Sequence, residues 1–292
     1  MTDRRDFWVK ASPEQIAQVC QDHGLRRIAP QVERTILSVT DLFATPVGAL
    51  DRQLIRGQAF TIHAVNDDGW AYGETTASRY SGWVNCADLY THPKASPTHR
   101  VSTRQSYGKS TTGLKRAGRI TPLSLGSELV VLDEAGGWSR VAWERGLRPS
   151  NAFVPSVHLV PVEHTESDPV AVAERLIGTP YLWGGNSAFG IDCSGLVQIS
   201  CDACGIPCPG DSDQQCAQLG ETLDPGTPPQ RGDLLFWKGH VGWVSDPDTL
   251  LHANAHSMSV TCEPLQAAIE RIAVQGDPVL RHARLTLGGK GV

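Results

Sequence analysis

The chain carries at residues 190–198 the stretch Gly190-Ile191-Asp192-Cys193-Ser194-Gly195-Leu196-Val197-Gln198, and this stretch decides the fold. It follows a Gly/Asn-rich turn and places a cysteine where an apolar run begins, which predicts a helix that starts at Cys193. Unpaired backbone N–H groups and the helix dipole at such an end favour the thiolate, the nucleophilic form of cysteine. We therefore interpret Cys193 as a candidate nucleophile.

Two histidines downstream are candidates for the base that a nucleophilic cysteine needs. His240 and His252 each lie in a short apolar run, and the turn Asp246-Pro247-Asp248 separates the runs, which predicts two adjacent strands. A helix-start cysteine that faces one histidine, with a second polar residue orienting the imidazole, is an arrangement for nucleophilic catalysis. His256 is an alternative orienter, because residues four apart on a strand point to the same face.

These motifs in combination resemble the NlpC-type family of bacterial cell-wall cysteine peptidases. The resemblance covers roughly residues 168 to 275 and rests on Asp-Cys-Ser-Gly at 192–195, on Arg231–Trp237 leading into His240, and on His252. It implies a papain-like fold in which Cys193 is the nucleophile, His240 the base and His252 the orienter, with no cofactor.

The part of the chain before this region reads as β-rich. Short β-prone runs alternate with Gly-Trp turns, a pattern typical of small barrels, and it resembles two bacterial SH3-like domains in tandem. The expected fold class is an α+β papain-like catalytic domain preceded by two small all-β SH3-like barrels. The expected domains are an N-terminal helical segment at 1–34 with Ser12 as its N-cap, SH3-like domains at 35–90 and 91–162, and the peptidase domain at 168–292, where Asp168 caps a helix.

This order of domains resembles a subgroup of the family, the γ-D-glutamyl-L-diamino-acid endopeptidases. The resemblance implies a cysteine peptidase that hydrolyses the γ-D-glutamyl–L-diamino-acid bond of murein tri- or tetrapeptides with a free N-terminal L-Ala, in cell-wall peptide recycling. It also assigns substrate contacts to Tyr181, to Asp192 and Ser194 beside the nucleophile, and to Asp211 and Ser212. A glutamyl carboxylate is bound well by hydroxyls and helix-terminal N–H groups.

The free amine of such a peptide needs a carboxylate and a phenol as partners. In the first barrel Asp51 and Tyr80 are the candidates for this pair. The family has Gly-Glu after the Leu-rich strand, whereas this chain has Gly57-Gln58, so Glu74 stays open as the amine-binding acid.

Composition limits the other classes of function. The 292 residues carry a formal net charge of −5, which argues against binding to nucleic acid. No stretch approaches the ~18–20 apolar residues of a membrane span, and the first residues lack the apolar core of a signal peptide. We expect a cytoplasmic monomer without membrane contact. The alternatives are a wall-remodelling endopeptidase, or a papain-related amidase or acyltransferase, whose SH3-like domains serve for targeting.

Four cysteines near the nucleophile have a spacing that could be read as a zinc or iron–sulfur site. They are Cys201, Cys204, Cys208 and Cys216. The first two continue the periodicity of the helix that starts at Cys193, and a Gly-Ile-Pro turn then ends that helix. We therefore expect these thiols to pack in the core and the protein to bind no metal.

Overall fold

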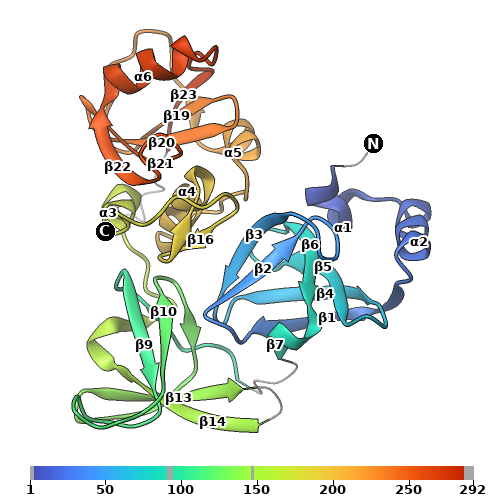
Figure 1. Ribbon diagram of the computed structural model, residues 1–292. Helices are drawn as coiled ribbons and strands as arrows, with labels where there is room; N and C mark the ends of the chain where they lie inside the picture. Colours follow the sequence, from blue (N-terminus) through green and yellow to red (C-terminus); the bar gives the residue numbers. More distant parts are fainter. Residues whose placement is uncertain (1–2, 91–94, 146–147, 286–292) are drawn as a thin grey trace. The chain divides into compact units, whose positions relative to one another are not determined.

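The computed structural model describes residues 3–90, 95–145 and 148–285 (Figure 1). The chain divides into two compact units, Met1–His164 and Thr165–Val292, and the division lies between the predicted domains at 91–162 and 168–292. The predicted boundary between the two β-rich domains, at residue 91, lies outside the described residues. Within the described part, no helix has the length and apolar character needed to cross a membrane.

Short helices open the N-terminal unit: η1 (Arg4–Asp6), α1 (Phe7–Lys10) and α2 (Pro13–Asp22). Ser12 caps α2, as predicted: its hydroxyl accepts a hydrogen bond from the backbone N–H of Gln15, and the Gln15 side chain accepts one from the N–H of Ser12. The chain leaves the helix through Gly24, whose φ of +59° suits glycine.

The first β-rich module begins earlier than the sequence analysis predicts. Strand β1 (Arg26–Thr35) pairs antiparallel with β4 (Ala59–Val65), so residues 26–34 are not part of a helical segment. Most of β1 is exposed or half-buried and carries charged side chains, so it lacks the apolar alternation by which strands are recognised. Residues 36–38 connect β1 to β2 (Val39–Phe43).

The sheet of this first module follows the order β3-β2-β6-β5-β4-β1-β7. Its remaining elements are β3 (Leu50–Ile55), β5 (Trp70–Thr75), β6 (Ser81–Asn85), the short helix η2 (Cys86–Asp88) and β7 (Leu89–Tyr90). Strands β4 to β6 occupy the predicted Gly-Trp repeat region, and their alternate residues fill one apolar core. That core contains Leu42, Leu54, Phe60, Ile62, Ala71, Tyr80, Val84 and Leu89.

A second all-β module follows, with strand orders β10-β9-β14-β13-β12 and β11-β8-β15. Its elements are β8 (His99–Val101), β9 (Gln105–Lys109), β10 (Ile120–Ser124), β11 (Glu128–Leu129), β12 (Val131–Ala135), β13 (Trp138–Arg145), β14 (Arg148–Pro155), η3 (Ser156–His158) and β15 (Leu159–Pro161). Arg34 of the first module donates to Glu128 at 2.8 Å, and the Arg56 guanidinium lies 3.7 Å from the centroid of the Trp143 ring. The SH3-like nature of this second module stays a prediction.

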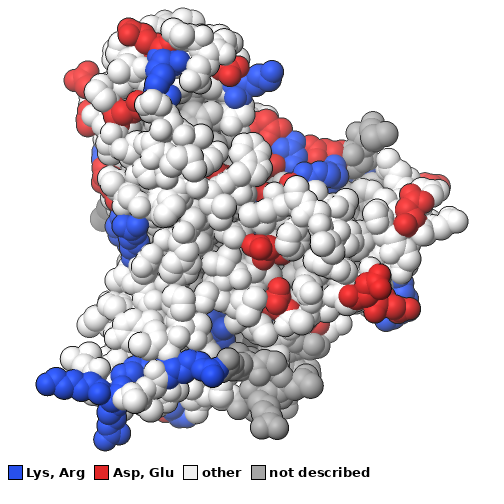
Figure 2. All heavy atoms as spheres, in the orientation of Figure 1, with Lys and Arg blue, Asp and Glu red and all other residues white. Residues whose placement is uncertain are grey.

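Charge is distributed unevenly over the two β modules. On the face drawn in Figure 2, Lys and Arg side chains gather over the second module, and Asp and Glu side chains gather over the first. The loop between β9 and β10 contributes exposed Lys115, Arg116 and Arg119. The formal net charge of −5 is therefore not spread evenly, although the whole chain is acidic.

The C-terminal unit is built on a sheet of order β18-β23-β19-β20-β21-β22. Asp168 caps the first helix, α3, as predicted, by accepting from the N–H groups of Val170 and Ala171. The elements are α3 (Pro169–Glu174), β16 (Asn186–Ser187), β17 (Gly190–Ile191), α4 (Cys193–Ala203), α5 (Ser212–Gln218), β18 (Glu221–Thr222), β19 (Asp233–Trp237), β20 (His240–Asp246), β21 (Thr249–Asn254), β22 (Ser259–Pro264), α6 (Leu265–Val274) and β23 (Arg281–Arg284).

Close packing of two helices on this sheet positions the functional residues. Helix α4 packs against β20 and β21, and α6 packs against β21 and β22. A Cβ atom at Gly195 would lie 2.5 Å from the Gly185 carbonyl oxygen, and one at Gly242 would lie 3.1 Å from the Cβ of His252. Gly195 needs glycine, because real Cβ atoms do not approach a backbone oxygen so closely, and a Cβ at Gly242 would require His252 to shift by a few tenths of an ångström.

Candidate active site

Cys193 is the first residue of α4, as the sequence predicts. Asp192 precedes it and caps the helix: its Oδ1 accepts from the backbone N–H of Gly195 at 2.6 Å, and its Oδ2 accepts from that of Gly184 at 3.0 Å. The cap therefore ties the helix start to the glycine turn before it. Cys193 is 6% exposed, so its thiol sits in a largely dry environment.

His240 is brought to this thiol by the start of β20. The Sγ atom of Cys193 lies 4.0 Å from the Gly239 carbonyl oxygen, and the backbone N–H of Val241 hydrogen-bonds to the same thiol. The two residues that flank His240 along the chain thus both contact Cys193. The predicted nucleophile and base are therefore neighbours in the fold.

The second predicted histidine, His252, lies directly behind the first. Its Nδ1 is 2.8 Å from Nε2 of His240, and the two rings meet edge to face with centroids 5.0 Å apart. The other candidate orienter, His256, is exposed and lies beyond the end of β21. The geometry favours His252 as the residue that orients His240.

Burial sets the protonation state of this pair. It raises the pKa of Cys193 to about 12, together with the nearby charge of Asp192 and against the backbone N–H groups of Val241 and Ser194. Burial also lowers the pKa of His240 to about 3, together with His252 and Arg271. The free site therefore holds a neutral thiol beside a neutral imidazole. The thiolate expected from the helix N-terminus is not the resting form, because desolvation outweighs the dipole.

Glu263 belongs to this site, and the sequence analysis missed it. Its Oε1 lies 2.6 Å from Nε2 of His252, and Arg271 of α6 forms an ion pair with the same carboxylate. Glu263 is on β22, where it pairs with Leu250, two residues from His252 on β21 and on the same face. No local signal marks such a diagonal neighbour, since only the strand register places it there.

The predicted substrate residues of the C-terminal unit surround the start of α4. Ser194 is buried and donates to Asp192 at 2.9 Å, so these two are bound to one another. Burial, followed by the charge of Cys193, raises the pKa of Tyr181. Asp211 and Ser212 begin α5, and Gln215 of that helix donates to the Ser194 carbonyl oxygen at 3.0 Å. Their contacts with substrate stay predictions.

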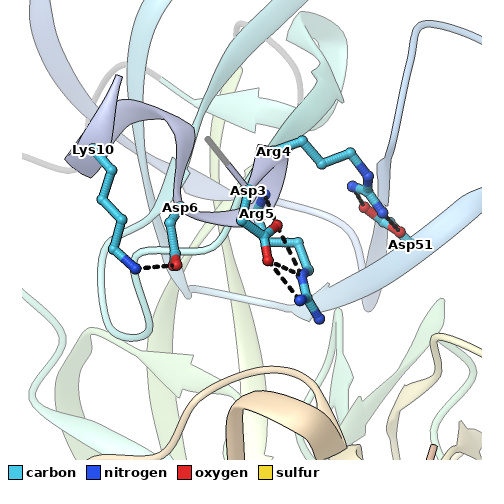
Figure 3. A network of polar contacts seen from close by, with 6 residues as sticks. All are labelled: Asp3, Arg4, Arg5, Asp6, Lys10 and Asp51. Carbon is cyan, nitrogen blue, oxygen red and sulfur yellow. Dashed lines mark hydrogen bonds and ion pairs between the residues drawn. The ribbon is translucent and has the colours of Figure 1, made fainter. Parts of the chain in front are cut away.

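The predicted amine-binding pair lies in the N-terminal unit and already has a cationic partner. Arg4 of η1 forms a two-pronged ion pair with Asp51, with Nη2 donating to Oδ1 at 2.7 Å (Figure 3). The hydrogen bond with Asp51 raises the pKa of Arg4, and Tyr80 adds to that shift. Asp51 and Tyr80 thus share one positive group. Glu74, the open alternative, is buried and bound to His63 and Arg79.

The four clustered cysteines pack as thiols. Cys201 and Cys208 are buried, and the hydrogen bond between them, followed by burial, raises the pKa of Cys201 well above its usual range. Cys204 and Cys216 are half-buried, and all four are free of disulfides. A protonated thiol is a poor metal ligand, which supports the packing interpretation.

We expect purified protein to contain no stoichiometric zinc or iron, because a hydrogen bond with Cys208 and burial raise the pKa of Cys201, and burial raises the pKa of Cys216. Elemental analysis of protein prepared without chelator measures this directly. Protein grown with added zinc is the control for weak adventitious binding, which dialysis against a mild chelator removes. Zinc or an iron–sulfur cluster retained in stoichiometric amount would contradict the expectation.

Comparison with known proteins covers the region that contains this site. Residues 178–274 match the family model described as NlpC/P60 family, and residues 42–89 match the one described as bacterial dipeptidyl-peptidase Sh3 domain. The chain is 31% identical to the γ-D-glutamyl-L-lysine dipeptidyl-peptidase of Bacillus subtilis over 62% of each chain. It is 26% identical to dipeptidyl-peptidase 6 of Lysinibacillus sphaericus over 79% of this chain and 90% of that protein.

A solved structure supports the fold as a whole. An NlpC/P60 family protein from Bacillus cereus superposes with a TM-score of 0.72 at 20% identity, over 87% of this chain and 99% of the other. The match to the Bacillus subtilis relative spans less than two thirds of that protein. The papain-like fold of the C-terminal unit and an SH3-like domain in the N-terminal unit agree with the prediction. Residues 178–274 therefore match a domain of the NlpC/P60 family, and a domain of the bacterial dipeptidyl-peptidase SH3 type precedes it in the chain.

Proposed function

We propose that this protein is a cysteine peptidase that hydrolyses the γ-D-glutamyl–L-diamino-acid bond of murein peptides with a free N-terminal L-Ala. The observation that carries the proposal is the presence, in one chain, of the Cys193–His240–His252 arrangement and a domain of the dipeptidyl-peptidase SH3 type. Relatives named γ-D-glutamyl-L-lysine dipeptidyl-peptidase support the bond assigned.

The first chemical step follows from the neutral thiol–imidazole pair. As Sγ of Cys193 attacks the γ-glutamyl carbonyl carbon, the thiol proton passes to Nδ1 of His240, since Nε2 of that ring contacts His252. A C–S bond forms and the carbonyl oxygen becomes an oxyanion. The C–N bond then breaks as His240 returns the proton to the leaving amine. Water hydrolyses the resulting thioester with His240 again as base.

The oxyanion is stabilised by groups at the start of α4. We assign this role to the backbone N–H of Cys193, at the free N-terminal end of the helix, and to the hydroxyl of Tyr181. Tyr181 keeps its proton because its pKa is raised, so it can donate a hydrogen bond throughout the reaction. Each such donor is worth about 2.7–4 kcal/mol in comparable sites.

Substrate contacts are proposed separately for each unit. Ser194, Ser212 and Asp211 lie at the starts of α4 and α5, where hydroxyls and N–H groups suit the α-carboxylate of D-Glu, and Asp192 holds that region in place. Asp51 and Tyr80 bind the free amine of L-Ala, which takes the place that the Arg4 guanidinium occupies. A charged amine and a guanidinium make the same demand on a carboxylate.

A requirement for a free amine places the enzyme in the recycling of wall peptides. In intact murein the amine of L-Ala is acylated by the glycan strand, so only released peptides carry the positive charge. We therefore assign the protein to cytoplasmic recycling, as a monomer. A wall-remodelling endopeptidase, or an amidase or acyltransferase that uses the same cysteine, would not require that charge.

We expect N-acetylation of L-Ala-γ-D-Glu-diaminopimelate to slow its hydrolysis about a hundredfold. Acetylation removes the positive charge that the half-buried Asp51 carboxylate would bind, and a hydrogen bond to a charged group is worth about 1.5–3 kcal/mol. Mass spectrometry of the products measures both rates. Asp51→Ala and Tyr80→Phe should raise KM for the free peptide and reduce the difference in rate between the free and acetylated peptides. The control is Asp133→Ala, which removes an aspartate paired with Arg140 on the second module. It should change neither the KM nor the rate difference.

Two results would count against this assignment. Equal rates on the free and acetylated peptides would show that no group of the protein binds the charged amine. Efficient digestion of intact murein sacculi would identify a wall-remodelling endopeptidase, and the SH3 domain would then serve for targeting.

A further inference from the structure

Both ring nitrogens of His252 have a polar partner, and the second partner is an acid that the catalytic sequence motifs do not contain. The His252 side chain is fully buried, with Nδ1 2.8 Å from His240 and Nε2 2.6 Å from Glu263. Glu263 reaches it from β22, and Arg271 reaches Glu263 from α6. A continuous polar chain thus runs from the catalytic imidazole to an ion pair at the rim of the sheet.

Glu263, at the end of this series of hydrogen bonds, determines which ring nitrogens of His252 and His240 carry a proton. A carboxylate only accepts hydrogen bonds, so the neutral His252 carries its proton on Nε2 and offers the lone pair of Nδ1. His240 must then donate from Nε2 to that lone pair. Its own Nδ1 is left without a proton and can accept the one on Cys193. With the opposite tautomer, His240 would already hold a proton on Nδ1 and could not act as a base.

We propose that Glu263 and Arg271 are positioning residues of this site: through His252, the Glu263 carboxylate holds His240 in its base-competent tautomer, and Arg271 holds the carboxylate in place. Neither residue touches the substrate or the reacting atoms. The proposal rests on the cysteine peptidase activity and not on which murein peptide is the substrate.

The two charges act on His240 in opposite directions, which provides a signature that packing alone would not produce. Glu263 raises the pKa of His240, whereas Arg271 lowers it. The other ionisable groups near the pair are His252 on β21, exposed His256 after that strand, and Cys193 with Asp192 at the start of α4. Removing Arg271 alone should therefore make His240 easier to protonate.

The first test is the tautomer itself, read from long-range ¹H–¹⁵N NMR spectra of protein labelled at histidine. We expect Nε2–H signals for both His240 and His252 in the wild type, assigned by their loss in the single His→Gln variants. In Glu263→Gln the amide N–H can donate to Nε2 of His252. His252 then donates from Nδ1 to Nε2 of His240, so that the proton of neutral His240 lies on Nδ1. Glu270→Gln, an exposed neutralisation on the same helix as Arg271, is the matched control and should leave both tautomers unchanged.

The second test is the pH profile of kcat/KM and of Cys193 alkylation. Glu263→Gln should lower kcat about ten- to a hundredfold with little change in KM, a smaller loss than the roughly 10⁴-fold cost when a carboxylate in direct contact with a catalytic histidine becomes an amide. In Arg271→Gln the loss of kcat/KM at low pH should begin at a higher pH, because His240 is protonated more easily. Arg271→Lys should return this limb of the pH profile toward its wild-type position. A merely structural defect would reduce the rate without shifting the acid limb of the pH profile or changing the tautomers of His240 and His252.

The outcomes separate this proposal from the substrate assignment. Wild-type tautomers and wild-type kcat in Glu263→Gln would overturn it, as would an acid limb that stays in place in Arg271→Gln. If Glu263→Gln does not fold, Arg271→Gln and Arg271→Lys still decide the question. If the wild type does not cleave γ-D-glutamyl peptides, the proposed function fails, but the tautomers and the alkylation profile need no peptide and remain decisive.

Discussion

Replacing Cys193 with alanine should lower kcat/KM by at least about 10⁴-fold, because losing the nucleophile of a catalytic triad removes the covalent pathway altogether. The fold should survive, since the change removes a single buried sulfur atom at the first turn of α4 and typical losses for such changes are about 1 kcal/mol. Peptide hydrolysis followed by mass spectrometry gives the rate, and thermal unfolding monitors the fold.

The control for this substitution is Cys262→Ala, which removes an exposed thiol from β22 and should leave turnover unchanged. Retention of more than a few per cent of wild-type turnover by a folded Cys193→Ala protein would show that another group is the nucleophile. Loss of turnover in both variants would point to a general sensitivity of the sheet instead.

Replacing His240 with alanine should be nearly as damaging, at about 10³-fold or more, because the base carries the proton in both half-reactions. His252→Ala should cost clearly less, since an orienter affects geometry and tautomer only. His256→Ala is the matched control from the same segment: it removes an exposed histidine and should have little effect. A loss in His256→Ala as large as that in His252→Ala would contradict the assignment of the orienter.

The rate at which iodoacetamide alkylates Cys193 tests the Cys193–His240 pair without a peptide substrate. With the pKa of Cys193 raised and that of His240 lowered, the wild-type rate should depend little on pH between 5 and 8, because the imidazole stays neutral and ready to take the proton. Without His240 the reaction needs free thiolate, whose fraction falls tenfold with each pH unit below the thiol pKa. Labelling at pH 6 should therefore slow sharply in His240→Ala, and unchanged labelling would show that His240 is not the partner of the thiol.

Local patterns in the sequence were sufficient for the parts of the site that single elements build. The helix that starts at Cys193 and the strands that carry His240 and His252 all follow from signals a few residues long. The β-rich N-terminal half was recognised from Gly-Trp turns in the same way. Strand β1 was missed because its charged, half-exposed residues carry no apolar alternation.

Residue types at short, fixed spacing were enough to predict the helix that starts at Cys193, the strands of His240 and His252, and the family resemblance. Three features could be seen only in the folded structure. Glu263 contacts His252, Arg4 forms an ion pair with Asp51, and the raised pKa of Cys193 favours a neutral thiol at rest. The first two depend on strand register and on chain segments far apart in sequence. The third depends on burial, which removes water from the thiol and outweighs the local helix dipole.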